Sequence, residues 1–289
     1  MSDALLVHLF AGGVVPYGTA PHFTKHISKA SRCYLSKAKL STKPYNQNLY
    51  LSKLRYLKKR GEPNKLLMSQ MKLKIYLFRH GQSHYNKHQW FTGWIDSKMT
   101  SEGFKNARNI AKKLQHKRID IAYHTRLSRS RQTLKEVLRY HPECKQIIKD
   151  DRMIERCYGK LQKHSHQEFM QEIELTVIEA MEKRYGKMPR EARSTIGMEI
   201  ATSIYDIYHR SYDIPPPGGE SVKDVEKRVQ SFIKDLLKKM KKEKVNVAIS
   251  AHGNSMRPFR RYFEKLSIPK MMSIENPWDD YFEYSIEVK

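Results

Sequence analysis

The stretch LKIYLFRHG at residues 73–81 decides the fold class. Its first six residues are apolar apart from one lysine and include aromatic and β-branched side chains, a pattern that predicts a buried strand. A second stretch, VNVAISAHGN at residues 245–254, ends in the same way, because a predicted strand over 245–250 is followed by a histidine and a glycine. Between the two stretches, predicted strands and helices alternate. This order predicts an α/β fold, namely a three-layer α/β/α sandwich with a mostly parallel central sheet.

The rest of the chain supplies the other elements of this fold. We expect further strands over residues 119–123, 146–148 and 281–288, and helices over residues 101–114, 129–138, 221–240 and about 255–266. Ser101 and Ser221 are the predicted N-caps of two of these helices, because a serine hydroxyl accepts hydrogen bonds from the unpaired amides of the first turn. The polar segment 165–210 is expected to be rich in helix.

Composition limits the possible functions without choosing one. The chain has 289 residues, of which 39% are hydrophobic, so it can bury a sizeable core and is not disordered throughout. Its 55 lysines and arginines against 30 acidic residues give a net charge of +25, which predicts attraction to anionic substrates or polyanions. Charge alone does not indicate nucleic acid.

Cysteine usage and hydropathy indicate a location. The three cysteines, Cys33, Cys144 and Cys157, lie far apart without metal-ligand spacing, so neither a disulfide framework nor a zinc knuckle is predicted. The apolar N-terminal stretch is a poor signal peptide, and no run approaches the roughly 18 to 20 apolar residues of a membrane span. We therefore expect a cytoplasmic protein without membrane attachment.

Residues 1–70 are predicted to form a basic, disordered extension to a catalytic domain at 71–289. They hold 12 lysines and arginines against only Asp3 and Glu62, and they show little periodicity. Tyrosines alternate with cations over 45–60, which permits polyanion or nucleic-acid binding, although a solvated tail is the favoured interpretation. Translation from Met68 or Met71 and an organellar presequence are further alternatives.

Candidate functional residues follow two of the predicted strands. In open α/β sheets ligands bind beyond the carboxyl ends of the strands, where His80 and His252 are expected. A single histidine is more often structural, but two His-Gly pairs at strand ends favour a common site. One imidazole can attack phosphorus while the other stabilises the phosphoryl oxygens. Arg79, and Arg129 at a predicted helix start, would add planar donors for phosphate.

A phosphoryl transfer also needs an acid for the departing oxygen. Glu155 is the candidate, because a carboxyl group close to an anionic phosphate retains its proton more readily. The alternative for Glu155 is a surface ion pair with Arg156, and the alternative for Arg129 is a solvated basic helix with Arg126 and Arg131. Spacing alone does not separate these interpretations.

Five short motifs, in order, resemble the histidine phosphatase superfamily and, within it, the cofactor-dependent phosphoglycerate mutases. They are RHGQS at 79–83, FTGW at 91–94, LSR at 127–129, ERCYG at 155–159 and HGNS at 252–255. The resemblance covers residues 73 to about 288 and is weakest over 163–212. It implies that His80 is the phosphorylated nucleophile, that Glu155 is the acid-base, and that three cationic or imidazole groups clamp the phosphoryl group: Arg79, Arg129 and His252.

The resemblance also implies a substrate site and a reaction. The substrate-binding positions would be Asn86, Thr92, Gly93, Arg156, Tyr158, Gly253 and Asn254. The implied reaction is the interconversion of 3-phosphoglycerate and 2-phosphoglycerate in glycolysis and gluconeogenesis, primed by 2,3-bisphosphoglycerate and without a metal. The expected partner is a small phosphorylated substrate, and a homo-oligomer is possible. A phosphatase that hydrolyses phosphomonoesters is the alternative.

One departure from the mutase pattern concerns the substrate. The mutases place a lysine shortly after the Tyr158-Gly159 segment, where this chain has His166, and no adjacent arginine pair follows. Four cations further along could substitute or could form a solvated helix face, the interpretation that we favour: Lys183, Arg184, Arg190 and Arg193.

Overall fold

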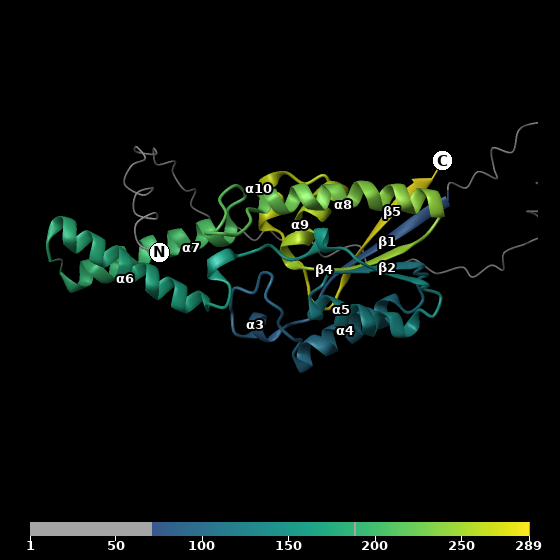
Figure 1. The fold of residues 1–289 in the computed structure, drawn as a ribbon, viewed down its shortest axis with the longest axis horizontal. Coiled ribbons are helices and arrows are strands. Elements are labelled where there is room, and N and C mark those ends of the chain that lie inside the picture. Colours follow the sequence, from purple (N-terminus) through teal and green to yellow (C-terminus); the bar gives the residue numbers. More distant parts are fainter. Residues whose placement is uncertain (1–70, 188, 289) are drawn as a thin grey trace, which may run out of the picture. The chain divides into compact units, whose positions relative to one another are not determined.

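The computed structural model describes residues 71–187 and 189–288, so the prediction for residues 1–70 lies outside the described part. A five-stranded sheet with the order β3-β2-β4-β1-β5 forms its centre (Figure 1). The strands are β1 (Met71–Arg79), β2 (Ile121–His124), β3 (Gln146–Lys149), β4 (Val247–Ala251) and β5 (Tyr281–Val288). All pairs are parallel except β1 with β5. The predicted mostly parallel sheet is confirmed.

Helices cover both faces of this sheet, as predicted. The helices that cover the sheet are α4 (Ser101–Leu114), α5 (Ser128–Val137), α8 (Val222–Glu243) and α9 (Gly253–Glu264). Figure 1 shows α8 and α9 on one side of the strands and α4 and α5 on the other. The resulting three layers are the predicted α/β/α sandwich.

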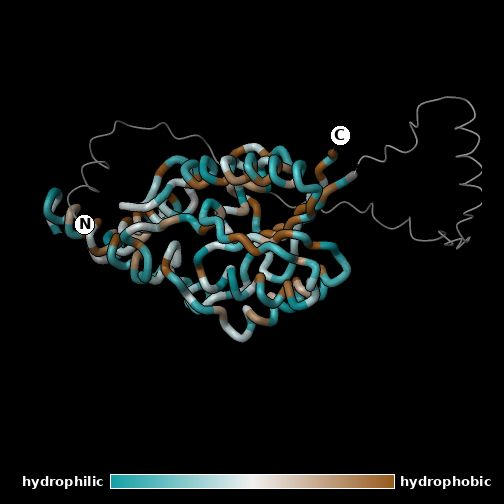
Figure 2. Tube along the Cα trace, turned by 45° about the vertical axis from the view of Figure 1, so that its right-hand side comes forward, coloured by the Kyte–Doolittle hydropathy of each residue, from teal (hydrophilic) through white to brown (hydrophobic). Residues whose placement is uncertain are grey.

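Side chains alternate between the two faces of β1, so this one strand contributes to two hydrophobic clusters. Ile75 and Leu77 join the cluster that contains Val229 of α8 and Phe259 of α9. Tyr76 and Phe78, which point the other way, join the cluster formed with α4 and α5. Because both faces of β1 are buried, its sequence is a nearly continuous apolar run. Figure 2 shows the same result, with the hydrophobic colouring gathered on the central strands.

Most predicted boundaries differ from the observed ones by a few residues, and one predicted cap is wrong. The N-cap of α4 is Thr100, whose Oγ1 accepts a hydrogen bond from the amide of Gly103 at 3.0 Å, while Ser101 is the first helical residue. The cap at Ser221 is confirmed, with its Oγ 3.1 Å from the amide nitrogen of Asp224. Two short helices, α3 (His84–Lys87) and α10 (Ile268–Ser273), were not predicted because each is too short to show a period.

The helix-rich segment 165–210 forms a hairpin of two helices, α6 (His166–Tyr185) and α7 (Arg190–Arg210). The two helices pack along each other and extend away from the sheet (Figure 1). Phe169 near the start of α6 packs edge-on against Phe91 of the loop after α3, so the base of the hairpin is anchored. Across the described residues, no helix is long and apolar enough to cross a membrane.

The cap of α8 gives a test of the fold. Replacing Ser221 by alanine removes the hydroxyl that pairs with Asp224, so we expect the free energy of unfolding to fall by about 1 kcal/mol. Chemical denaturation followed by circular dichroism measures this change. The matched control is Lys234→Ala on the exposed face of the same helix, for which a change below about 0.5 kcal/mol is expected. Equal effects of the two variants would contradict the assigned cap.

Candidate active site

The pairing of β1 with β4 brings the two predicted histidines together. Arg79 lies opposite Ala251 in the register of the two strands, and the amide of His80 donates to the carbonyl of Ala251 at 3.0 Å. His80 and His252 are therefore the first residues beyond the two adjacent strand ends. Both are buried, and their ring centroids are 4.9 Å apart.

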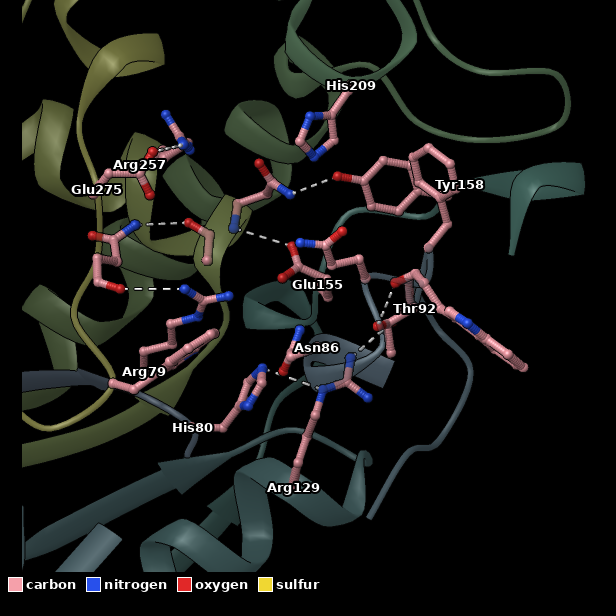
Figure 3. Close-up of a pocket in the computed structure, with 18 of the residues that line it drawn as sticks. Arg79, His80, Asn86, Thr92, Arg129, Glu155, Tyr158, His209, Arg257 and Glu275 are labelled. Carbon is pink, nitrogen blue, oxygen red and sulfur yellow. Dashed lines mark hydrogen bonds and ion pairs between the residues drawn. The ribbon is translucent and has the colours of Figure 1, made fainter. Parts of the chain in front are cut away.

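The surroundings of His80 prepare one ring nitrogen for attack. Its Nδ1 lies 2.8 Å from the carbonyl oxygen of Gly81, which accepts and therefore requires the proton on Nδ1. Nε2 is then the unprotonated nitrogen, and it accepts a hydrogen bond from Nε of Arg129 at 3.3 Å (Figure 3). Burial, together with Arg129 and Arg79, holds the pKa of His80 well below the usual value. His80 is therefore a neutral imidazole with its lone pair directed to the cavity.

His252 is held by a different contact. Its Nε2 lies 2.8 Å from Oγ1 of Thr125, and its buried Nδ1 has no hydrogen-bond partner among the described residues. Burial, followed by the charge of Arg129, lowers the pKa of His252 as well. His252 is fully buried and is not among the residues that line the cavity, so its ring lies against that of His80 behind the cavity surface.

Arg129 is fixed by the backbone before any ligand binds. It is the second residue of α5, and its guanidinium donates to the carbonyls of Ile95 and Gly93, each at 2.9 Å. Burial lowers the pKa of Arg129 to about 10, so the group is still charged at neutral pH. A buried, charged and rigid guanidinium beside a neutral imidazole favours an anion at this point.

Arg79 supplies a second cation beside the histidines. Its Nη1 donates to the carbonyl of Asn276 at 3.3 Å, and its guanidinium lies over the ring of Trp278 at 4.7 Å from the centroid. Burial lowers the pKa of Arg79, while Glu155 acts in the opposite direction. These contacts with the segment before β5 hold the guanidinium at the edge of the same cavity.

Glu155 lies in the cavity and not in a surface ion pair with Arg156. Its Oε1 accepts from the backbone amides of Arg156 at 2.8 Å and Asn254 at 3.0 Å. Because Oε1 is held in this way, Oε2 is the oxygen that can carry a proton toward a ligand. The side-chain amide of Asn254 donates in turn to the hydroxyl of Tyr158 at 3.3 Å, so the predicted substrate residues Asn254 and Tyr158 face the same space (Figure 3).

The segment that follows β1 forms another side of the cavity, to which Asn86, Thr92 and Gly93 contribute. Gly93 has a positive φ of 50°, and a Cβ there would lie 2.1 Å from Oε1 of Gln162. The positive φ and the close Gln162 side chain favour glycine at this position, and the carbonyl of Gly93 holds Arg129. Gly253, at the start of α9, also lines the cavity.

Arg156 does not line this cavity, contrary to the prediction. Its fully buried guanidinium points the other way and donates to three backbone carbonyls, those of Glu220, His209 and Ile214. A long side chain that satisfies three carbonyls ties the loop of Glu155 to the end of α7 and to the segment before α8. Its role is to hold these segments together.

The structure adds residues that the sequence analysis did not single out. Arg257 of α9 lines the cavity beside Glu275, at 3.8 Å, and Trp278 and Asn276 complete this side. His209 lines the other side together with His166, the residue at the lysine position of the mutases. The sequence contains one signal for His209. Tyr205 and His209 are four residues apart, a spacing that places two side chains on the same face of a helix.

The basic residues of the hairpin that could have replaced the missing arginine pair are elsewhere. Arg184 lies over the ring of Tyr185, and Arg193 pairs with Glu182 at 3.3 Å. Lys183 is exposed on the same part of α6. None of these three lines the cavity, which agrees with their interpretation as a solvated helix face.

The cavity fits an anion better than a metal ion. Ligand atoms of His80, Glu155 and His252 lie within 4.8 Å of one another, a spacing that a cation could use. The guanidinium groups of Arg79 and Arg129 adjoin this cluster, however, and would repel a cation. Two cations and the neutral imidazole of His80 around a cavity of about 230 Å³ are suited to a phosphoryl group, and the buried ring of His252 packs against that of His80.

A family model and several relatives match this arrangement. The chain belongs to the histidine phosphatase superfamily (branch 1), whose model matches residues 75–194 and 175–281. A relative named 2,3-bisphosphoglycerate-dependent phosphoglycerate mutase, from Parvibaculum lavamentivorans, is 34% identical over 204 residues, which cover 69% of this chain and 84% of the relative. The chain is therefore an enzyme of this superfamily.

Solved structures of a phosphatase and of a phosphoglycerate mutase share the fold of this chain. An α-ribazole phosphatase from Shigella flexneri matches with a TM-score of 0.54 at 18% identity, over 73% of this chain and 89% of that one. A phosphoglycerate mutase from Bacillus anthracis matches with a TM-score of 0.52 at 17% identity, over 75% of this chain and 93% of that one. At these identities the likeness shows the fold alone.

The protonation state of His80 can be measured directly. Because burial and two arginines lower its pKa, we expect the ring to stay neutral, with the proton on Nδ1, at pH 6 and above. Ring ¹⁵N chemical shifts recorded between pH 5 and 8 report this state. A midpoint near the unperturbed value of about 6.5, or a proton on Nε2, would contradict the assigned environment.

The position of Arg156 gives a second test. Arg156→Ala removes a fully buried side chain and leaves three partly buried carbonyls without this donor, so we expect a loss of about 1–3 kcal/mol in unfolding free energy. Arg118→Ala on the surface is the matched control, with a change of about 1 kcal/mol or less. Unchanged stability of Arg156→Ala with a raised KM would instead indicate a substrate contact.

Proposed function

We propose that this enzyme interconverts 3-phosphoglycerate and 2-phosphoglycerate through a phosphohistidine at His80 and is primed by 2,3-bisphosphoglycerate. The observation that carries the proposal is the unprotonated Nε2 of His80 in a cavity lined by Arg129 and Arg79, with the buried ring of His252 beside it. The mutase names of relatives at about 30% identity support the choice of substrate.

The first chemical step follows from these positions. Nε2 of His80 attacks phosphorus, so a nitrogen–phosphorus bond forms while the bond to the alcohol oxygen breaks. Glu155 gives its proton to the departing oxygen, and Arg79, Arg129 and His252 bind the three equatorial oxygens, on which negative charge is spread. His80 then carries the phosphoryl group, and the alcohol stays in the cavity.

The second step decides between two enzymes. Once primed by 2,3-bisphosphoglycerate, a mutase transfers the phosphoryl group from His80 to the free hydroxyl of a bound phosphoglycerate, with Glu155 accepting the proton of that hydroxyl. His80 then takes the other phosphoryl group from the bisphosphate so formed, which regenerates the phosphohistidine and releases the isomer. A second candidate function, hydrolysis of phosphomonoesters, requires water in place of this hydroxyl. One observation favours it, because His166 stands at the position where the mutases have a substrate-binding lysine, and the pKa of His166 is lowered by burial.

Turnover of the full chain tests both candidates. We expect conversion of 3-phosphoglycerate to 2-phosphoglycerate that depends on a trace of 2,3-bisphosphoglycerate and releases little inorganic phosphate. ³¹P NMR measures all four species in one sample. His80→Gln is expected to remove the activity, whereas His116→Gln, an exposed histidine at the end of α4, is expected to leave it unchanged.

The other outcomes are equally informative. Release of phosphate without isomerisation, and without dependence on the bisphosphate, would replace the mutase with the phosphatase. Full turnover of the His80→Gln variant would contradict both.

A further inference from the structure

Two imidazoles in the cavity have no part in phosphoryl transfer. His166 is the first residue of α6 and His209 lies near the end of α7, so the base of the helical hairpin brings them together. Their ring centroids are 5.3 Å apart, and both line the cavity that holds His80. Figure 3 shows His209 and Tyr158 on the side of the cavity away from His80 and Arg129.

The surroundings of this histidine pair are aromatic. Phe91 lies 4.4 Å from the ring of His166 and 6.1 Å from that of His209, and the ring of Tyr158 is stacked at 6.4 Å from His209. The hydroxyl of Tyr205 is 3.1 Å from Nδ1 of His166. Because Tyr205 occupies Nδ1, the Nε2 atom of His166 is the one left for a ligand.

Charged groups around the pair are few among the described residues. The elements packed against the histidine pair contribute three titratable or charged groups: Tyr205 of α7, and Tyr158 and Arg156 of the loop before α6. The guanidinium of Arg156 donates to the carbonyl of His209. Across the cavity are five further charged groups: Arg79, Arg129, Arg257, Glu155 and Glu275.

Among the described residues that line the cavity, none at this end carries a fixed positive charge. Arg79 and Arg129 adjoin His80 and serve the transferred phosphoryl group, and Arg257 pairs with Glu275. A phosphorylated hydroxy acid brings a carboxylate in addition to its phosphate. Among the described residues that line the far end, the side chains that can become cationic to meet this carboxylate are His166 and His209, and His166, whose pKa burial lowers, must first take up a proton.

We propose that His166 and His209 recognise the carboxylate of a phosphorylated hydroxy acid by taking up protons on binding, which makes the affinity for such substrates depend on pH. The inference deepens the proposed function, since it names the part of the cavity that selects the substrate. The imidazolium N–H groups donate to the two carboxylate oxygens, and the protons come from solvent. Proton uptake by the two histidines does not increase the affinity for phosphate esters that lack a carboxylate.

The direction of the pH dependence follows from the charges. Burial lowers the pKa of His166, so its ring is neutral in the free enzyme at pH 7. A bound carboxylate favours the charged ring and raises that pKa in the complex. Affinity is therefore highest in mildly acidic solution and falls as the pH rises, by up to tenfold per pH unit for each proton taken up.

Two matched ligands separate this effect from the titration of phosphate itself. Glycerol 3-phosphate resembles 3-phosphoglycerate in its phosphate ester but has no carboxylate. Calorimetric titration of the full chain carrying His80→Gln, which prevents turnover, measures both ligands between pH 5.5 and 8 in two buffers of different ionisation enthalpy. We expect 3-phosphoglycerate to take up about one proton more than glycerol 3-phosphate and to lose affinity more steeply with pH.

Two variants of His166 test whether this histidine is responsible. His166→Lys, in the same background, carries a permanent charge, so the excess proton uptake should fall, and 3-phosphoglycerate should bind more tightly at pH 8. His166→Gln should also lose the uptake but bind 3-phosphoglycerate weakly at every pH. His116→Gln is the control that should change nothing, and thermal melting by circular dichroism confirms that each variant is folded.

Several results would overturn the inference. Equal proton uptake for the two ligands would do so, as would parallel pH dependences or the absence of 3-phosphoglycerate binding throughout the range. Failure of the proposed function gives a different result. In that case 3-phosphoglycerate binds with excess proton uptake, but the wild-type chain does not isomerise it.

Discussion

The parallel pairing of β1 with β4 is the constraint on which the site depends. Because Arg79 lies opposite Ala251, the residues after the two strands, His80 and His252, emerge side by side at one edge of the sheet. A shift of one residue in this register would direct one imidazole to the opposite face of the sheet. The buried side chains on both faces of β1 fix the register. The packing that forms the hydrophobic core therefore also determines the geometry of the site.

The electrostatics of the site combine a neutral nucleophile with fixed cations. Burial keeps the two imidazoles uncharged, while the higher intrinsic pKa of arginine keeps Arg129 charged in the same surroundings. Backbone carbonyls, rather than carboxylates, hold Arg129 in place. The charges of Glu155 and Asp96 act on Arg129 as well, but its hydrogen bonds are made with carbonyls, so the guanidinium can meet an oxyanion without reorganisation.

Much of this arrangement could be predicted from the sequence, because it depends on local patterns. Buried strands, amphipathic helices and the rule that ligands bind beyond strand ends led to the fold and to His80 and His252. Arg156 was misplaced because its sequence position, next to Glu155, does not reveal which way a side chain points. His209 was missed because its role depends on the packing of a helical hairpin, which no local pattern specifies.

The substrate side of the cavity is where this chain departs most from the mutase pattern. A lysine carries its positive charge at any physiological pH, whereas an imidazole carries one only after protonation. The same phosphoryl-transfer machinery can therefore serve different substrates, depending on the few residues at the base of α6 and α7. Both enzyme candidates share the step at His80.

The most direct test of the account is to locate the phosphoryl group on the protein. After brief incubation of the full chain with 2,3-bisphosphoglycerate and an alkaline quench, peptide mass spectrometry should find one acid-labile phosphate, on His80. A phosphate on another residue, or a chain that stays unmodified under conditions in which it turns over substrate, would contradict the central claim.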